Sequence, residues 1–199
     1  MELLNTLRTL CTTFGPSGQE KEIASVIAAL AAPYVDEISR DVLGNLIVHK
    51  KGSGPKVMFA AHMDSIGLMV THITDEGFLR VGKLGGISPR DMLGIPVRFQ
   101  NGVMGMVYED DELGDVKREM GHLFIDIGAK NAEEARERVQ VGDAAVFAAF
   151  TNQSGHALIS PYLDNRVSCL ALLWAMELLE ETDNDLYFVF TTQEEVGTR

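Results

Sequence analysis

Five residues with imidazole or carboxylate side chains stand beside apolar segments of this 199-residue chain. They are His62, Asp64, Asp164, Glu194 and Glu195. An imidazole combined with several carboxylates, and without a thiolate, is a ligand set for Zn²⁺, Co²⁺ or Mn²⁺. A bridging carboxylate can also hold two such ions about 3.5–4 Å apart, as in hydrolytic two-metal sites. These residue types make a metal-dependent hydrolase one candidate function.

The segments before these residues explain how they could meet. The apolar runs 57–61 and 186–190 are short and continuous, which predicts strands buried on both faces of a sheet. In open α/β sheets, ligands bind beyond the carboxyl ends of the strands. If the two strands are neighbours, the residues that follow them converge at one edge of the sheet.

Each pattern taken alone has a simpler interpretation. His62 and Asp64 could form a hydrogen bond within a turn. Asp164 could cap the predicted helix 165–180, because an N-cap carboxylate accepts from a backbone amide of the first turn. Glu194 and Glu195 could belong to an exposed loop. Composition and spacing leave these alternatives open beside the metal site.

The rest of the chain has two textures. Helical periodicity covers residues 1–11 and the segment around 20–30. Ser17 and Glu20, at the start of the second segment, have the spacing of a capping box. A pattern typical of alternating helices and strands returns near residue 158. Between them, short β segments follow one another with glycine-rich turns, including the hairpin signal Asn101–Gly102. We predict an α/β fold in which residues 1–66 and 158–199 form a mixed central sheet flanked by helices. Residues 67–157 form a small β-barrel-like insert.

Charge and composition exclude some classes of partner. Seventeen Lys and Arg residues against 29 Asp and Glu residues give a formal charge of −12, which argues against nucleic acid and anionic membranes. No apolar run approaches the roughly 20 residues that a membrane span needs. The first residues lack a basic signal-peptide region, so we expect a cytoplasmic protein.

Three motifs, in this order along the chain, resemble the M42 family of metallo-aminopeptidases. They are Ala61–Gly67, Leu163–Arg166 and Gln193–Arg199, and similar matches occur at Gly15–Gly18, Asp41–Asn45 and Ile125–Ala129. The resemblance implies a dinuclear metal-dependent aminopeptidase that removes N-terminal residues from peptides through a metal-bound water. It also implies a catalytic α/β domain and an insert that assembles a homo-oligomer.

The resemblance further implies a role for each candidate residue. His62 binds one of two divalent ions, with Zn²⁺ as the first choice and Co²⁺ or Mn²⁺ as alternatives. Asp64 fixes the tautomer of that imidazole. Asp164 bridges the ions, Glu195 binds the second ion, and Glu194 is the general base that takes a proton from the water.

The chain departs from the family pattern because family members continue well beyond the Glu194–Glu195 motif. We therefore expect the C-terminal part of the catalytic domain to be absent, leaving each metal two of three protein ligands. We also expect an exposed sheet edge next to residues 186–190, with weak zinc binding and self-association. A second hypothesis is a catalytically inactive remnant that acts as an assembly or metal-binding module. A glycosidase is disfavoured because Glu194 and Glu195 are adjacent in sequence, whereas glycosidase carboxylates flank the scissile bond.

Overall fold

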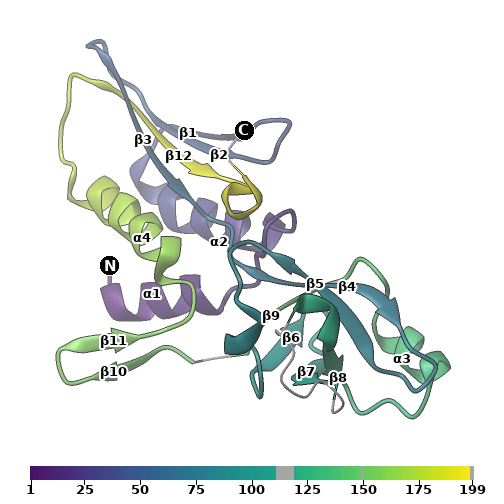
Figure 1. The fold of residues 1–199 in the computed structure, drawn as a ribbon. Coiled ribbons are helices and arrows are strands. Elements are labelled where there is room, and N and C mark those ends of the chain that lie inside the picture. The colour runs from purple at the N-terminus through teal and green to yellow at the C-terminus, as the bar shows by residue number, and fades with distance from the viewer. Residues whose placement is uncertain (111–118, 149, 198–199) are drawn as a thin grey trace. The chain divides into compact units, whose positions relative to one another are not determined.

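The computed structural model describes residues 1–110, 119–148 and 150–197 (Figure 1), so the last two residues of the Gln193–Arg199 motif lie outside the described part. The chain divides into two compact units, Met1–Ser65 with Phe150–Arg199, and Ile66–Ala149. The predicted insert ended later, at residue 157. Residues 150–157 lie instead with the first unit, and β10 (Asn152–Ser154) pairs there with β11 (Ala157–Ile159) in one antiparallel hairpin.

A mixed four-stranded sheet forms the centre of the first unit, in the order β1-β2-β12-β3. The strands are β1 (Glu37–Arg40), β2 (Leu46–Lys50), β3 (Lys56–His62) and β12 (Asp185–Thr191). β2 pairs antiparallel with β1 and with β12, whereas β12 and β3 run parallel. The predicted mixed sheet is confirmed, and the two apolar runs are neighbouring strands.

Helices pack against this sheet and form the core of the unit. They are α1 (Leu3–Thr12), α2 (Lys21–Ala31), the 3-10 turn η1 (Ala32–Tyr34) and α4 (Leu163–Leu178). Apolar residues at helical spacing face inward, for example Leu7 and Leu10 in α1 and Ile23 and Ile27 in α2. They meet the inward side chains of the strands, such as Phe190, so the same periodicity that predicts the helices explains their packing.

The strands β3 and β12 were both predicted to be buried on both faces, and both predictions were wrong. Strand β3 is not buried on both faces, since Met58 is 68% exposed and Phe59 is 44% exposed. Within the described residues the edge strands of the sheet are β1 and β3, and β3 has a hydrogen-bonded neighbour on one side only. The strand β12, which was expected to border an exposed edge, lies between β2 and β3. Along β12, buried and half-buried residues alternate, as expected for a strand with one covered face.

The second unit is a closed barrel with strand order β4-β5-β8-β7-β6-β9, which confirms the barrel-like insert. Its strands are β4 (Gly67–Ile73), β5 (Leu79–Leu84), β6 (Pro96–Phe99), β7 (Met104–Glu109), β8 (Leu123–Asp126) and β9 (Ala144–Phe147). The helix α3 (Ala132–Arg138) and two 3-10 turns, η2 (Pro89–Asp91) and η3 (Met120–His122), complete it. Alternate residues of the strands fill the barrel with a continuous apolar core.

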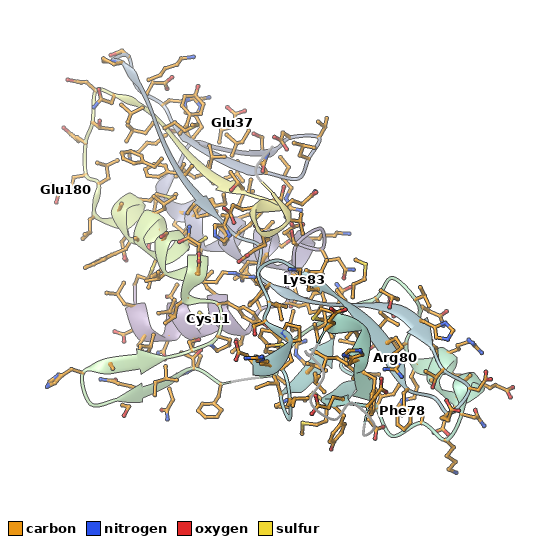
Figure 2. All side chains as sticks on the ribbon, in the orientation of Figure 1. Cys11, Glu37, Phe78, Arg80, Lys83 and Glu180 are labelled. Atoms are coloured by element: carbon orange, nitrogen blue, oxygen red, sulfur yellow. The ribbon has the colours of Figure 1, made fainter. Side chains whose placement is uncertain are left out.

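Two local features of the barrel involve polar residues. The guanidinium of Arg80, labelled in Figure 2, makes two hydrogen bonds to Asp110 of 2.9 and 2.8 Å and lies over the ring of Phe124. The Asn101–Gly102 hairpin forms, but only Gly102 takes a positive φ, of 89°. Asn101 instead accepts a hydrogen bond from the amide of Val103, so its side chain closes the turn.

The described helices of both units are too short or too polar to cross a membrane.

Candidate metal centre

The parallel pairing of β3 and β12 places the candidate residues at one edge of the sheet. His62 is the last residue of β3 and stands opposite Thr191, the last residue of β12. The 3-10 turn η4 (Glu194–Val196) follows β12 at that edge. The expectation that the residues after the two strands converge is confirmed, because the carboxyl ends of parallel strands meet at the same side.

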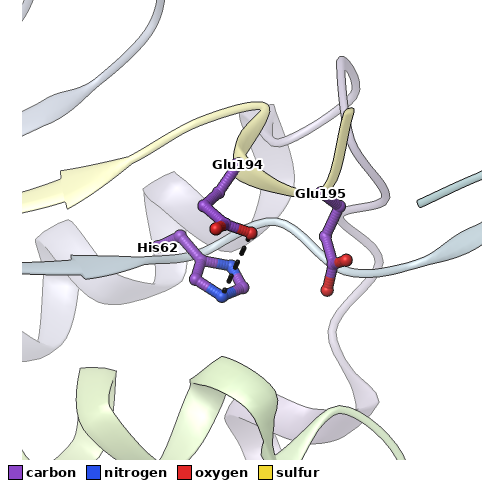
Figure 3. Close-up of side chains that lie close together, drawn as sticks. All are labelled: His62, Glu194 and Glu195. Carbon is purple, nitrogen blue, oxygen red and sulfur yellow. Dashed lines mark ion pairs between the residues drawn. The ribbon is translucent and has the colours of Figure 1, made fainter. Parts of the chain in front are cut away.

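The imidazole of His62 lies among three carboxylates. Its Nε2 atom is 3.1 Å from Oδ1 of Asp164 and 3.8 Å from Oε2 of Glu194, and its Nδ1 atom is 3.4 Å from Oδ1 of Asp64. Ligand atoms of His62, Glu194 and Glu195 all lie within 4.8 Å of one another. Figure 3 shows both glutamates reaching from the η4 turn toward the ring. Separate elements of the first unit thus bring all five predicted residues together.

Asp164 does not cap a helix. The N-cap residue of α4 is Tyr162, which makes no side-chain capping bond, and the backbone of Asp164 is not helical. Its side chain is 87% exposed and its carboxylate lies beside His62. The capping interpretation from the sequence is therefore wrong for this residue, and its carboxylate instead makes a 3.1 Å hydrogen bond with Nε2 of His62.

Neighbouring charges and burial shift the pKa values of the groups in the site. The contact with Asp64 raises the pKa of His62 to about 9, while burial acts in the opposite direction. Burial also favours a higher pKa for Asp64, but its contacts with His62 and with two backbone amides outweigh that effect and hold the pKa low. Burial raises the pKa of Glu195. An imidazolium among carboxylates is the state expected without a metal, since the cation offsets their mutual repulsion.

Asp64 has a second role that the sequence did not indicate, because it also binds the backbone of the two glutamates. It is fully buried, and besides facing His62 its two carboxylate oxygens accept hydrogen bonds of 3.1 Å from the amides of Glu194 and Glu195. One side chain therefore orients the imidazole and also fixes the backbone of both glutamates. The predicted orientation of His62 fits this geometry, because Nδ1 faces Asp64 and Nε2 faces the other acids.

Glu20 and Arg166 hold backbone segments of the first unit in place, and the sequence did not indicate either role. The capping box of Ser17 and Glu20 was a wrong prediction, because α2 begins after Glu20 and makes no such bonds. Glu20 instead accepts from the amides of Gly18 and Gln193. Arg166 is fully buried and donates to the carbonyls of Leu10 and Gly15, so it fixes the loop after α1. The only sequence signal was that these residues lie in or beside the quoted motifs.

The donor set fits a divalent metal. A nitrogen atom and several carboxylate oxygens converge without a thiolate, which is a combination suited to Zn²⁺, Co²⁺ or Mn²⁺. Nδ1 of His62 is buried and has no hydrogen bond of good geometry, and a carboxylate oxygen of Asp64 lies 3.4 Å from it. In metal-binding histidines a carboxylate often faces the ring nitrogen that does not bind the metal and fixes the tautomer. The site can bind cations and can supply a carboxylate as a proton acceptor.

Comparisons with known proteins place the chain among aminopeptidases. Residues 44–199 match the model of the family described as M42 glutamyl aminopeptidase. A relative from Acetivibrio thermocellus is 47% identical, covering 100% of this chain and 60% of the relative. The lysyl aminopeptidase of Pyrococcus furiosus is 39% identical, covering 93% and 57%. The chain thus spans about three fifths of the length of these relatives.

Solved structures show the same fold. The aminopeptidase APDkam598 from the archaeon Desulfurococcus kamchatkensis superposes with a TM-score of 0.92 at 37% identity, covering 98% of this chain and 57% of that chain. The TET1 peptidase of Pyrococcus horikoshii, which can assemble into a tetrahedron or a large octahedral shell, has a TM-score of 0.86 at 35% identity, covering 98% and 62%.

Proposed function

The chain belongs to the M42 family of aminopeptidases, and we propose that its His62, Asp164 and Glu195 side chains hold two divalent ions of a peptide-hydrolysing site. One observation carries the proposal. Carboxylate oxygens of Asp164 and Glu194 lie 3.1 and 3.8 Å from Nε2 of His62, which ends one of two parallel strands. Asp164 is nearest to the imidazole and most exposed, which suits a bridging ligand.

Each remaining residue has a chemical task in this proposal. When bound, the ions lower the pKa of water and polarise the peptide carbonyl. Asp64 keeps the Nδ1 proton of His62 directed toward itself, so that Nε2 is available as a ligand. Glu194 takes the proton of the attacking water and returns it to the leaving amine, as a general base and then a general acid.

The substrate and assembly are parts of the same proposal. We propose peptides with a free N-terminus as substrates, since the relatives are named aminopeptidases and a group of acids can hold a substrate ammonium. The barrel would serve homo-oligomer assembly, an idea supported by the shells that the Pyrococcus horikoshii peptidase forms. Cys11 and Cys169 are buried and free, in keeping with a cytoplasmic location.

The experiment is a metal titration combined with a hydrolysis assay. Zn²⁺ and Co²⁺ binding to purified residues 1–199 is measured by calorimetry, and hydrolysis of leucine-, lysine- and glutamate-p-nitroanilide is followed with each metal. His62→Gln should weaken binding at least about tenfold, whereas His72→Gln, an exposed histidine of the barrel, should not.

The outcomes separate the hypotheses. Metal-dependent hydrolysis that His62→Gln abolishes supports the aminopeptidase. Binding without turnover supports the alternative, a catalytically inactive metal-binding or assembly module. Equal metal binding by His62→Gln and the unaltered chain contradicts the proposed site.

A further inference from the structure

Four successive backbone amides after strand β12 each donate to a side-chain oxygen from another part of the chain. They belong to Thr192, Gln193, Glu194 and Glu195. Asp64 accepts the last two, as described above. The first two go to Asn45 and Glu20, residues with no place in the proposed chemistry. Each backbone amide from Thr192 to Glu195 is therefore fixed by its own hydrogen bond to a side chain.

Glu20 fixes the second of these amides. The residue is only 7% exposed, and a single carboxylate oxygen, Oε1, accepts from the amide of Gly18 at 2.7 Å and from that of Gln193 at 3.0 Å. Gln193 has a φ of 57°, in the left-handed region that non-glycine residues seldom adopt. Such a conformation persists only when its surroundings hold it in place. The bond from Gln193 to Glu20 is one such restraint, directly before Glu194.

Asn45 fixes the first amide, and its own orientation is set by Asp41. Its Oδ1 atom accepts from the backbone amide of Thr192 at 2.9 Å and from the Thr192 hydroxyl at 3.2 Å. Its Nδ2 group donates to Oδ2 of Asp41 at 2.8 Å, while its backbone amide donates to Oδ1. With the amide nitrogen turned toward Asp41, the carbonyl oxygen of the side chain must face Thr192.

We propose that Glu20 and Asn45 are positioning residues for the metal site. Acting through the backbone of residues 192–195, they keep the carboxylates of Glu194 and Glu195 near the imidazole of His62. This inference rests on the proposed function, since it assigns a purpose to the arrangement of those carboxylates. Neither residue is among the proposed metal ligands, and both act through hydrogen bonds to the backbone. Their loss leaves all the ligands present but widens the range of positions that the glutamates occupy.

The test compares Glu20→Ala, Glu20→Gln and Asn45→Ala with the unaltered chain, using Zn²⁺ alone as the probe. Glu22→Ala is the matched control, because Glu22 is an exposed acid in the first turn of α2. Three quantities are measured: the Zn²⁺ dissociation constant, the hydrogen-exchange rates of the amides of residues 192–195 in the metal-free chain, and the thermal midpoint.

Glu20→Ala should weaken Zn²⁺ binding by about 10-fold or more, the scale seen for residues that orient ligands. It should also speed exchange at the Gln193 amide, and Asn45→Ala should do the same at Thr192. Glu20→Gln should restore both properties, because one carbonyl oxygen can accept both hydrogen bonds. The control should match the unaltered chain.

The results that overturn the inference are specific. It is wrong if Glu20→Ala and Asn45→Ala bind Zn²⁺ as the unaltered chain does. It is also wrong if their loss of affinity only follows a lowered thermal midpoint, without faster exchange at Gln193 or Thr192. If Glu20→Ala does not fold, Asn45→Ala decides the question by the same two measurements. An unaltered chain that binds no Zn²⁺ contradicts the proposed function instead, and the inference with it.

Discussion

Asp64 gives a quantitative prediction about stability and pH in the metal-free chain. Its contact with His62 is the largest cause that raises the pKa of the imidazole from 6.5 to about 9. The folded chain therefore binds a proton more tightly than the unfolded chain does. The resulting stabilisation is fully present below pH 6.5 and is lost as the pH rises through about 9.

The size of this effect follows from the two pKa values. A change of one in pKa corresponds to about 1.4 kcal/mol, so the change from 6.5 to about 9 amounts to roughly 3–4 kcal/mol. That value is an upper bound for Asp64, because Asp164 and Glu194 also favour the charged imidazole. We expect Asp64→Asn to remove about half or more of the pH-dependent loss, since it keeps the shape but not the charge.

The assay is urea unfolding with a chelator present, at pH 6.5 and at pH 9. Asp64→Asn is destabilised at both pH values, because its amide group can accept only one of the two backbone hydrogen bonds. The informative quantity is therefore the difference in unfolding free energy between the two pH values within each variant. Glu22→Gln removes one exposed acid and serves as the control. An equal difference in Asp64→Asn and the unaltered chain would refute the reasoning.

Three further outcomes are expected. In a preparation that hydrolyses aminoacyl p-nitroanilides, Glu194→Gln should lower kcat by about 10²–10⁴ while calorimetry shows unchanged Zn²⁺ affinity; an unchanged kcat would reassign the base. Met58→Lys, on the exposed edge strand, should reduce concentration-dependent association in sedimentation without lowering the thermal midpoint. A hydrogen bond with His49 lowers the pKa of Asp185, so stability from this pair is lost as the pH falls through that pKa. Asp185→Asn should flatten the acid side of a plot of thermal midpoint against pH.

Much of the first unit could be predicted because strands and helices leave local patterns in the sequence. The short apolar runs at 57–61 and 186–190 predicted two strands, and parallel strands bring their following residues to one edge. The pattern therefore predicted that His62 and Glu194 lie together if the two strands are neighbours, which they are. What periodicity could not reveal is which strand has a neighbour on each side. That depends on the whole sheet, as does the cover over each face, and the exposure of Met58 and Phe59 shows that the prediction for β3 was wrong.

The restraints on the site were beyond prediction for a different reason. Ser17 and Glu20 have the spacing of a local capping box, yet the Glu20 carboxylate reaches an amide 173 positions away in the chain. Asn45 likewise bonds an amide 147 positions away. Side-chain bonds to distant backbone groups leave no periodic signal, because the partner amide is present in every residue except proline. Such contacts become visible only once the strands that carry them are placed.

The occupied amides also limit the chemistry of the site. Exposed backbone amides at a turn can bind anions or stabilise a developing oxyanion, but those of residues 192–195 already donate to Asn45, Glu20 and Asp64. The turn therefore presents its carboxylates and keeps its amides inward. A site built in this way attracts cations, which suits both divalent metals and the ammonium group of a peptide substrate. In the proposed aminopeptidase reaction these amides are not available to polarise the scissile carbonyl, so the proposal assigns that task to bound metal, and metal binding is its decisive measurement.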